Sequence, residues 1–281
     1  LLAAGFAWNR MWSVLPWERL GLCLVLAGMA FALALPLRRF ARWPWASALA
    51  LVWVLALAGF AGPLQLLSAL ALAAAALALG GPLSPADTPA RLALGTTVGL
   101  ALIAGVGGWV LTLPIHFVWA WWGLVVGLLL WRRHALHAMV GKTMLDWRAA
   151  VGQSPRWAAF AVTCLGLAST AAWLPTMQVD DLAYHLGLPS QLLAYGEYRP
   201  DPAHQIWSYA PWAGDALQGF AAVLAAGHAR GGVNALWLVL AAAAIWSACA
   251  RMGARPAERW GAVALFASMP PLVWMAAGMQ T

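Results

Sequence analysis

The chain is an almost unbroken succession of long apolar segments separated by short polar ones. A helix needs roughly 20 apolar residues to cross a bilayer, and a crossing segment must be helical because lipid offers its backbone no hydrogen-bond partners. Of the 281 residues, 63% are hydrophobic and 9% are charged, which is more apolar surface than a soluble fold of this size can bury. The sequence therefore predicts an all-α, polytopic membrane protein with about eight or nine transmembrane helices. The expected spans are 18–37, 43–61, 63–80, 92–113, 114–131, 157–175, 214–229, 232–250 and 260–278.

Basic residues gather in the connections between these segments and indicate the orientation. Arg38, Arg39 and Arg42 follow the first span. A second basic stretch occupies residues 132–156, which we expect to form an amphipathic helix on the inner surface. Because cytoplasmic loops are rich in Lys and Arg, alternation through the first six spans places the segment after Pro175 on the outer face.

One segment conflicts with the rule that successive spans cross the membrane in alternating directions. A full crossing by residues 214–229 would put Arg251, Arg255 and Arg259 on the outer face, against the charge rule. That segment has only about 16 residues, fewer than a span needs. We therefore expect a short re-entrant or juxtamembrane element there.

Charge and cysteine usage exclude two other classes of protein. The net charge of +7 comes from basic residues in short loops, as in membrane anchors, so nucleic acid is not an expected partner. Cys23, Cys164 and Cys249 lie in apolar runs without a CxxC pair, which indicates small buried side chains rather than disulfides or a zinc site. The chain begins without Met and stops in mid-pattern at Gln280-Thr281, so we expect a fragment of a longer protein.

The one long polar connection, about residues 176–213, is strongly acidic. It and the residues just after it contain five of the nine acidic residues of the chain, and Arg199 is the one cation among them. Solvation of a loop does not require carboxylates at this density, so the concentration suggests a function. The five acidic residues are Asp180, Asp181, Glu197, Asp201 and Asp215.

Asp180 and Asp181 stand side by side just beyond the span 157–175. Adjacent carboxylates repel each other, so the pKa of one should rise unless a cation lies between them. Such a pair suits a hard divalent metal such as Mg²⁺ or Mn²⁺, or a general base that takes a proton from an attacking hydroxyl. The structural alternative is that one of them caps a helix beginning at Leu182.

The residues after the pair predict two short juxtamembrane helices. On the first, Asp181 and His185 are four residues apart and share a face, so the carboxylate could tune the imidazole or complete a metal shell. The alternative is an interfacial histidine that bonds to the backbone. The second helix covers 190–195 and should end at Gly196.

Two further side chains of the loop have open roles. Arg199 could bind a phosphate, or it could pair with Glu197 or Asp201. Tyr209 is either an interface anchor or a platform for a sugar.

An ordered set of residues in and after this loop forms a loose motif. The set comprises the run Asp180–Leu186 (DDLAYHL), Leu188-Pro189, Gly196, Tyr209-x-Pro211, Gly227, Asn234, residues 250–253 and residues 264–270. It resembles the first outer loop and the following helices of GT-C fold glycosyltransferases, most narrowly the bacterial dolichyl-phosphate-mannosyltransferase-like membrane proteins. The resemblance covers about residues 160–281. It divides the chain into N-terminal transmembrane helices with a cytoplasmic loop (1–156) and the start of a GT-C-like module (157–281). In that family the acidic loop usually follows the first helix, whereas here five spans and the 132–156 segment precede the helix that leads into it.

The resemblance implies a membrane glycosyltransferase of the bacterial inner membrane. Such an enzyme takes a sugar from a polyprenyl-phosphate donor and transfers it to an acceptor on the periplasmic or extracellular side. It implies that Asp180 or Asp181 is the catalytic base or a metal-linked carboxylate, with His185 and Arg199 near the lipid phosphate. Tyr184, His204 and Tyr209 complete the expected substrate-binding set.

Two other classes of function remain as alternatives. A transporter should carry ionisable residues within its spans, but here His116, near the outer end of a span, is one of the few candidates. A non-catalytic membrane scaffold would use the outer loop to bind a partner. The scaffold predicts that the aspartate pair can be neutralised without loss of function.

Overall fold

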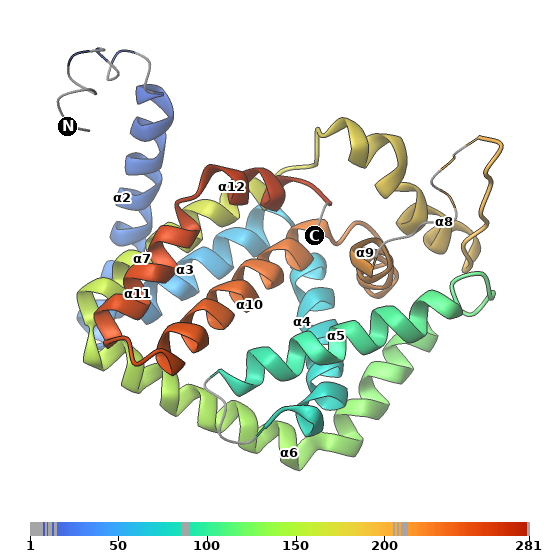
Figure 1. The fold of residues 1–281 in the computed structure, drawn as a ribbon, viewed down its shortest axis with the longest axis horizontal. Helices are drawn as coiled ribbons and strands as arrows, with labels where there is room; N and C mark the ends of the chain where they lie inside the picture. Colours follow the sequence, from blue (N-terminus) through green and yellow to red (C-terminus); the bar gives the residue numbers. More distant parts are fainter. Residues whose placement is uncertain are drawn as a thin grey trace.

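The computed structural model describes residues 16–85, 90–204 and 213–279, together with residues 8, 10, 13, 206 and 208. Most of these residues are helical and none lies in a strand (Figure 1), which confirms the all-α prediction. The longer helices are α2 (Trp17–Phe40), α3 (Trp45–Phe60), α4 (Pro63–Gly80), α5 (Arg91–Trp109), α6 (Val118–Gln153), α7 (Pro155–Ser169), α8 (Gly187–Tyr195), α9 (Ala213–Ala225), α10 (Arg230–Arg251), α11 (Pro256–Ala267) and α12 (Pro270–Ala277).

Four of the described helices are long and apolar enough to cross a membrane. They are α2, α5, α10 and α4 with the short turn that extends it to Leu83. The pair α11 and α12 adds a fifth if the two helices, bent by 61°, form one broken span. The helices thus support an integral membrane protein, while the expected number of eight or nine spans remains a prediction.

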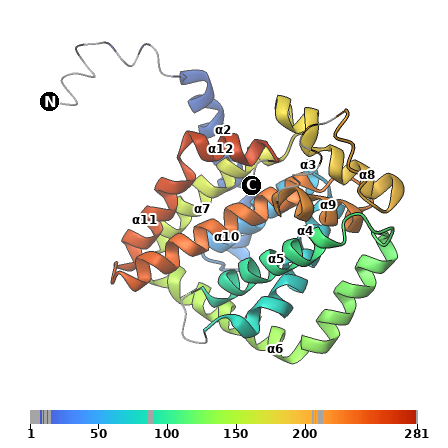
Figure 2. The ribbon, with the colours of Figure 1, turned by 45° about the vertical axis from the view of Figure 1, so that its right-hand side comes forward.

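Several boundaries follow from proline. Helix α4 begins at Pro63, as the sequence predicts, because the first turn of a helix does not need the N–H that proline lacks. The expected span 260–278 is interrupted near Pro270, because a proline inside a helix cannot donate the backbone hydrogen bond. Helix α11 ends at Ala267, and α12 starts at Pro270. Most of the expected span 114–131 and of the segment 132–156 lies instead on one long helix, α6 (Val118–Gln153), which bends in its middle (Figure 2).

The helices pack in two apolar clusters. One joins α4, α5, α9 and α10 and has the fully buried Phe220 among its members. The other joins α2, α3, α7 and α11 around Leu49 and Trp260. Small residues let helix backbones touch in the first cluster, as expected for membrane helices. A Cβ on Gly99 of α5 would lie 1.7 Å from the carbonyl oxygen of Ala76 on α4.

Helix α2 differs from the others because most of its apolar surface is uncovered. Only Ala30 and Ala34 are buried along its 24 residues, and the helix projects from the bundle (Figure 1). Leu24 and Leu33 have 65% and 63% of their surface exposed. A continuous apolar face of this length is the surface that lipid would cover.

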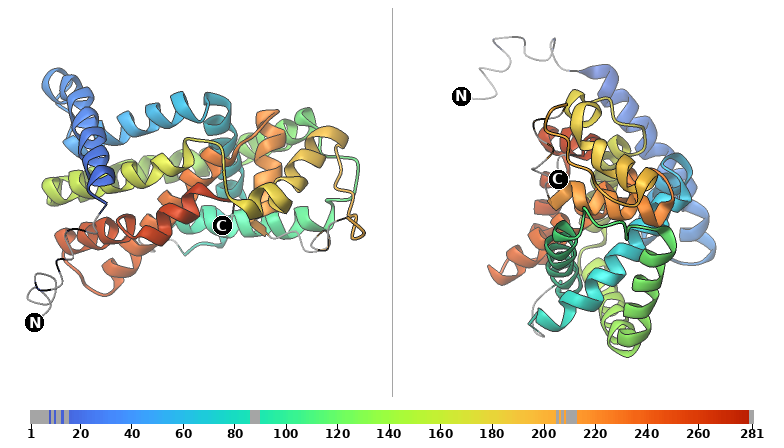
Figure 3. Two further views of the ribbon diagram at one scale, coloured as in Figure 1. Left: turned by 90° about the horizontal axis from the view of Figure 1, so that it is seen from above. Right: turned by 90° about the vertical axis from the view of Figure 1, so that its right-hand side faces the viewer.

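Acidic and basic connections lie at different ends of the molecule. Helices α8 and α9 lie at one end of the bundle, and the connection from α10 to α11 lies at the other (Figures 1 and 3). Helix α9 has 13 residues and runs across the direction of α10, which agrees with the expectation of a short element at 214–229. Twelve of its residues are buried, so α9 is an internal helix. Helix α8 of the acidic segment packs against it.

Candidate functional site

The acidic segment starts with a local irregularity of the backbone. Residues 179 and 180 are α-helical, and Asp181–His185 form a single π-helical turn before α8. Such turns are rare and are found frequently at functional sites. Helix α8 ends at Tyr195, and Gly196 follows in the left-handed conformation with φ of 69°, as the sequence predicts.

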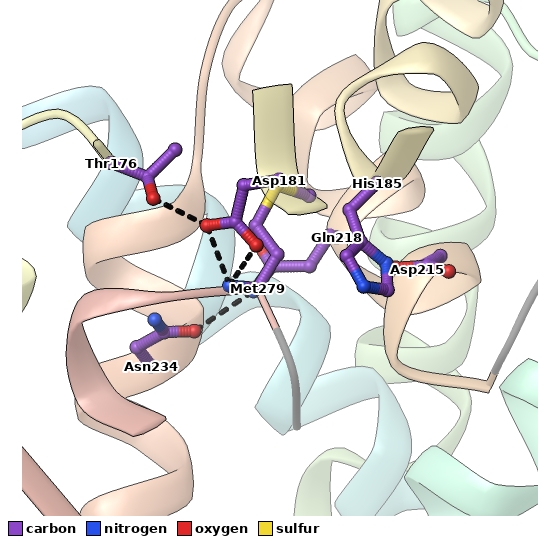
Figure 4. A network of polar contacts seen from close by, with 7 residues as sticks. All are labelled: Thr176, Asp181, His185, Asp215, Gln218, Asn234 and Met279. Carbon is purple, nitrogen blue, oxygen red and sulfur yellow. Dashed lines mark hydrogen bonds and ion pairs between the residues drawn. The ribbon is translucent and has the colours of Figure 1, made fainter. Parts of the chain in front are cut away.

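The two adjacent aspartates have different surroundings. Asp180 is exposed, whereas Asp181 has no exposed surface. Asp181 accepts a hydrogen bond from the Thr176 hydroxyl, and both of its carboxylate oxygens lie 3.0 Å from the backbone nitrogen of Met279 (Figure 4). The pair therefore does not converge on a common point. Neither side chain caps a helix at Leu182, because the helical stretch already begins at residue 179 and Asp180 makes no capping bond.

His185 has a carboxylate partner from another helix. Its Nδ1 lies 2.7 Å from Oδ1 of Asp215, in the first turn of α9, and both side chains are buried. An ionised carboxylate can only accept, so Nδ1 carries the hydrogen and Nε2 is the basic nitrogen. The sequence suggested Asp181 as this partner. The structure corrects that prediction, because the packing of α8 on α9 brings a residue 30 positions away against the imidazole.

Polar side chains of α9 and α10 extend the site beneath Asp181. Gln218 Nε2 donates to Asn234 Oδ1 at 2.9 Å, and the Asn234 amide donates to the carbonyl oxygens of Ala276 and Gly278. Gln218 and Asn234 both lie close to Met279 (Figure 4). The amide pair thus holds the segment after α12 against the acidic turn.

Arg230 binds the same segment from the other side. This buried side chain donates to the carbonyl oxygens of Ala276, Ala277 and Leu174. The Arg230 cation therefore donates to backbone carbonyl oxygens, while the Asp181 carboxylate accepts from a backbone N–H. Both are charge-assisted hydrogen bonds to the backbone. Arg230 was not among the residues predicted from the sequence, although an arginine at the start of an apolar helix is a signal of function.

Tyr184 lies among the carboxylates. Burial raises the pKa of its phenol, and the charges of Asp180, Asp215 and Asp181 raise that pKa further. The ring of Tyr184 lies 4.2 Å from that of His185, measured between centroids. At neutral pH the hydroxyl therefore keeps its proton and can donate a hydrogen bond to an anion.

Arg199 and His204, two other predicted substrate-binding residues, pair with acidic residues outside this cluster. Arg199 Nε lies 2.6 Å from Glu197 Oε1, and the guanidinium lies over the ring of Tyr195. The structure thus contains the local ion pair that the sequence offered as one alternative, and phosphate binding by Arg199 stays a prediction. His204 is exposed and pairs with Asp201 at 2.7 Å, and this hydrogen bond lowers the pKa of the Asp201 carboxyl. Tyr209 lies outside the described residues.

The expected divalent metal has no ready set of ligands in the described part of the chain. No group of three or more His, Cys, Asp or Glu side chains converges there. The two aspartates proposed as ligands face different surroundings, one exposed and one buried. Asp181 already uses both oxygens for backbone and hydroxyl donors.

Fold and site together define an all-α integral membrane protein that has a buried polar network beneath an acidic turn at one end of its helices. Comparisons with protein-family models, curated proteins and solved structures found no match to the chain.

Proposed function

We propose that this chain belongs to a membrane glycosyltransferase that moves a sugar from a polyprenyl-phosphate donor to an acceptor on the outer face. The observation that carries the proposal is that Asp180 is exposed five residues before His185 on the acidic turn, while His185 is buried and paired with Asp215. The resemblance of the run Asp180–Leu186 to the first outer loop of GT-C enzymes supports the same reading.

The location of this cluster suits a lipid-linked substrate. A polyprenyl tail has to stay in lipid, whereas the phosphosugar has to meet acceptors from water. The turn at 179–185 follows an apolar helix, α7, and packs on the buried α9. In our proposal α3, α6 and α7 also cross the bilayer, which would restore the expected count, and residues 176–213 face the periplasm or the cell exterior.

Asp180 is the side chain that we assign as the general base. Its carboxylate takes the proton of the acceptor hydroxyl while that oxygen bonds to the anomeric carbon. The bond from that carbon to the phosphate oxygen breaks, and polyprenyl phosphate leaves with the electron pair. Asp181 is a positioning residue, since its carboxylate is buried and fully engaged.

His185 and Tyr184 are assigned to the departing phosphate. Asp215 holds the imidazole through Nδ1, which leaves Nε2 to take up a proton and then donate a hydrogen bond to a phosphate oxygen. The protonated Tyr184 phenol donates to the phosphate as its negative charge grows. A divalent metal, Mg²⁺ or Mn²⁺, stays an additional proposal for this step.

The test is turnover by the purified full-length protein. Radiolabelled polyprenyl-phosphate mannose and glucose serve as donors, with and without Mg²⁺ or Mn²⁺, and release of polyprenyl phosphate is the readout. Asp180→Asn should lower turnover by roughly 10²–10⁴-fold. Asp201→Asn is the matched control, because this carboxylate of the same loop pairs with His204 outside the cluster.

A scaffold or a transporter gives a different outcome. Wild-type turnover by Asp180→Asn, with normal folding, would exclude Asp180 as the base. Absence of donor cleavage by the unmodified protein with either sugar would count against the transferase itself.

A further inference from the structure

We infer a second site, at the opposite end of the bundle, that binds the headgroup and part of an acyl chain of an anionic phospholipid. The inference concerns a cavity of about 480 Å³ between α2, α3 and α7. Two arginines, Arg38 and Arg156, line it together with Thr163 and with apolar side chains that include Phe31, Ala159 and Phe160. It is independent of the proposed transferase reaction.

The cavity has a cationic end and an apolar end. Arg38 lies near the end of α2, and Arg156 lies in the first turn of α7. On α2 and α7 the lining residues Phe31, Ala159, Phe160 and Thr163 lie three to seven residues from these arginines, roughly 5–10 Å away at 1.5 Å per residue, and Pro155 lines the cavity next to Arg156. An amphiphilic anion matches this order, since its phosphate can meet the guanidinium groups while its tail follows the apolar wall.

Charge complementarity selects the kind of lipid. Both arginines are exposed, and none of the described residues that line the cavity is acidic. Arg38 donates through Nη1 to the Trp43 carbonyl at 3.3 Å, which holds it at the rim. Basic pockets between membrane helices bind anionic headgroups in this way, whereas a zwitterionic headgroup would place a second cation against the arginines.

The apolar wall distinguishes a lipid from a free phosphate ion. Phe31 packs against Trp45 with ring centroids 5.3 Å apart. Phe160 and Phe31 offer surface that an inorganic phosphate cannot use. The exposed apolar face of α2 continues from the cavity, so an acyl chain that leaves it stays in contact with apolar side chains.

The experiment is a lipid titration of the full-length protein in detergent by native mass spectrometry. The probes are dioleoyl phosphatidylglycerol and dioleoyl phosphatidylcholine, which share acyl chains and differ in charge. We expect one phosphatidylglycerol to bind in preference to phosphatidylcholine. The double variant Arg38→Gln/Arg156→Gln should weaken that binding about thirtyfold.

A second double variant, Arg39→Gln/Arg133→Gln, is the matched control. It removes the same charge from exposed arginines that do not line the cavity, and we expect less than about a threefold change. Equal losses in the two double variants, or equal binding of both lipids by the unmodified protein, would overturn the site.

A cavity-filling variant tests the apolar end without changing charge. Ala159→Leu places extra volume at the wall and should weaken phosphatidylglycerol binding. If inorganic phosphate displaces the lipid and Ala159→Leu has no effect, the arginines bind free phosphate and the lipid assignment fails. The Ala159→Leu variant and the comparison of the two lipids test the lipid site even if the arginine variants do not fold.

Discussion

Both oxygens of the Asp181 carboxylate lie 3.0 Å from the backbone nitrogen of Met279, a residue 98 positions further along the chain. The contact closes a network in which Asp181, Arg230 and Asn234 hold one short backbone segment from different sides. An acidic residue that looks catalytic in the sequence is thus used to connect the acidic turn with the end of α12.

Asp181→Asn should destabilise the protein, because a buried acceptor becomes partly a donor. The new NH₂ group would face either the Met279 N–H or the Thr176 hydroxyl, and loss of one such buried bond costs about 1–3 kcal/mol. Thermal unfolding of the purified protein, followed by tryptophan fluorescence, measures the effect. Asp180→Asn is the control, since Asp180 is exposed, and equal melting temperatures for the two variants would contradict the structural role of Asp181.

Gly99→Ala should separate α4 from α5. The new Cβ would lie 1.7 Å from the Ala76 carbonyl oxygen, and only a shift of backbone can relieve that clash. We expect a loss of about 1–3 kcal/mol or more. Gly105→Ala on the same helix has no atom within 4 Å of its new Cβ and should be neutral or stabilising by up to about 1 kcal/mol. Thermal unfolding in detergent compares them, and equal stabilities would show that the close approach is not essential.

Protonation of His116 should weaken the connection between α5 and α6. Trp121 Nε1 donates to Nδ1 at 3.2 Å, and Nε2 lies 2.9 Å from the Val110 carbonyl, so the contacts match the neutral imidazole. Burial lowers the pKa of His116 below 6.5, and the hydrogen bond to Val110 opposes this only in part. The unfolded chain therefore binds a proton first, and stability is lost as the pH falls from about 6.5 through the lower pKa of the folded state.

The pH dependence can be assigned by mutation. Melting temperatures of the unmodified protein at pH 7.5 and pH 5.5 should differ, and His116→Gln should reduce the difference. His137→Gln, which changes an exposed histidine on α6, should leave it unchanged. An unaltered pH dependence in His116→Gln would rule out this residue as its source.

Ser190→Cys should react with an impermeant maleimide in intact cells. Ser190 is exposed on α8, and the proposed topology places α8 outside. The experiment uses a background in which Cys23, Cys164 and Cys249 are replaced. Gln153→Cys, at the end of α6, should react only after the membrane is opened. The reverse pattern would invert the topology.

Local chemistry made much of the fold predictable. Long apolar runs gave the helical class, Pro63 gave the start of α4, and Gly196 gave the end of α8, because each depends on its own backbone. The break between α11 and α12 was missed although Pro270 was visible in the sequence. The continuity of α6 was missed because basic residues after 131 suggested a boundary where the helix simply continues.

The contacts of the candidate site were only partly predictable. The density of carboxylates pointed to the segment in which the structure contains a buried polar cluster, and His185 was expected to have a carboxylate partner. Its pairing with Asp215 depends on how α8 packs against α9, which no local pattern encodes. The same holds for Arg230, whose partners are backbone carbonyls far along the chain.

Backbone contacts at glycine divide the helices by how freely they can move. At Gly99 the backbone of α5 lies against that of α4. A Cβ on Gly232 of α10 would lie 2.2 Å from the Gln65 carbonyl oxygen of α4. We therefore expect these three helices to resist sliding and rotation against one another. Gly21 and Gly28 of α2 have no atom within 4 Å of an added Cβ. Because α2 lacks such close backbone contacts at these glycines, we expect it to shift against the bundle more readily than α4, α5 and α10 shift against one another.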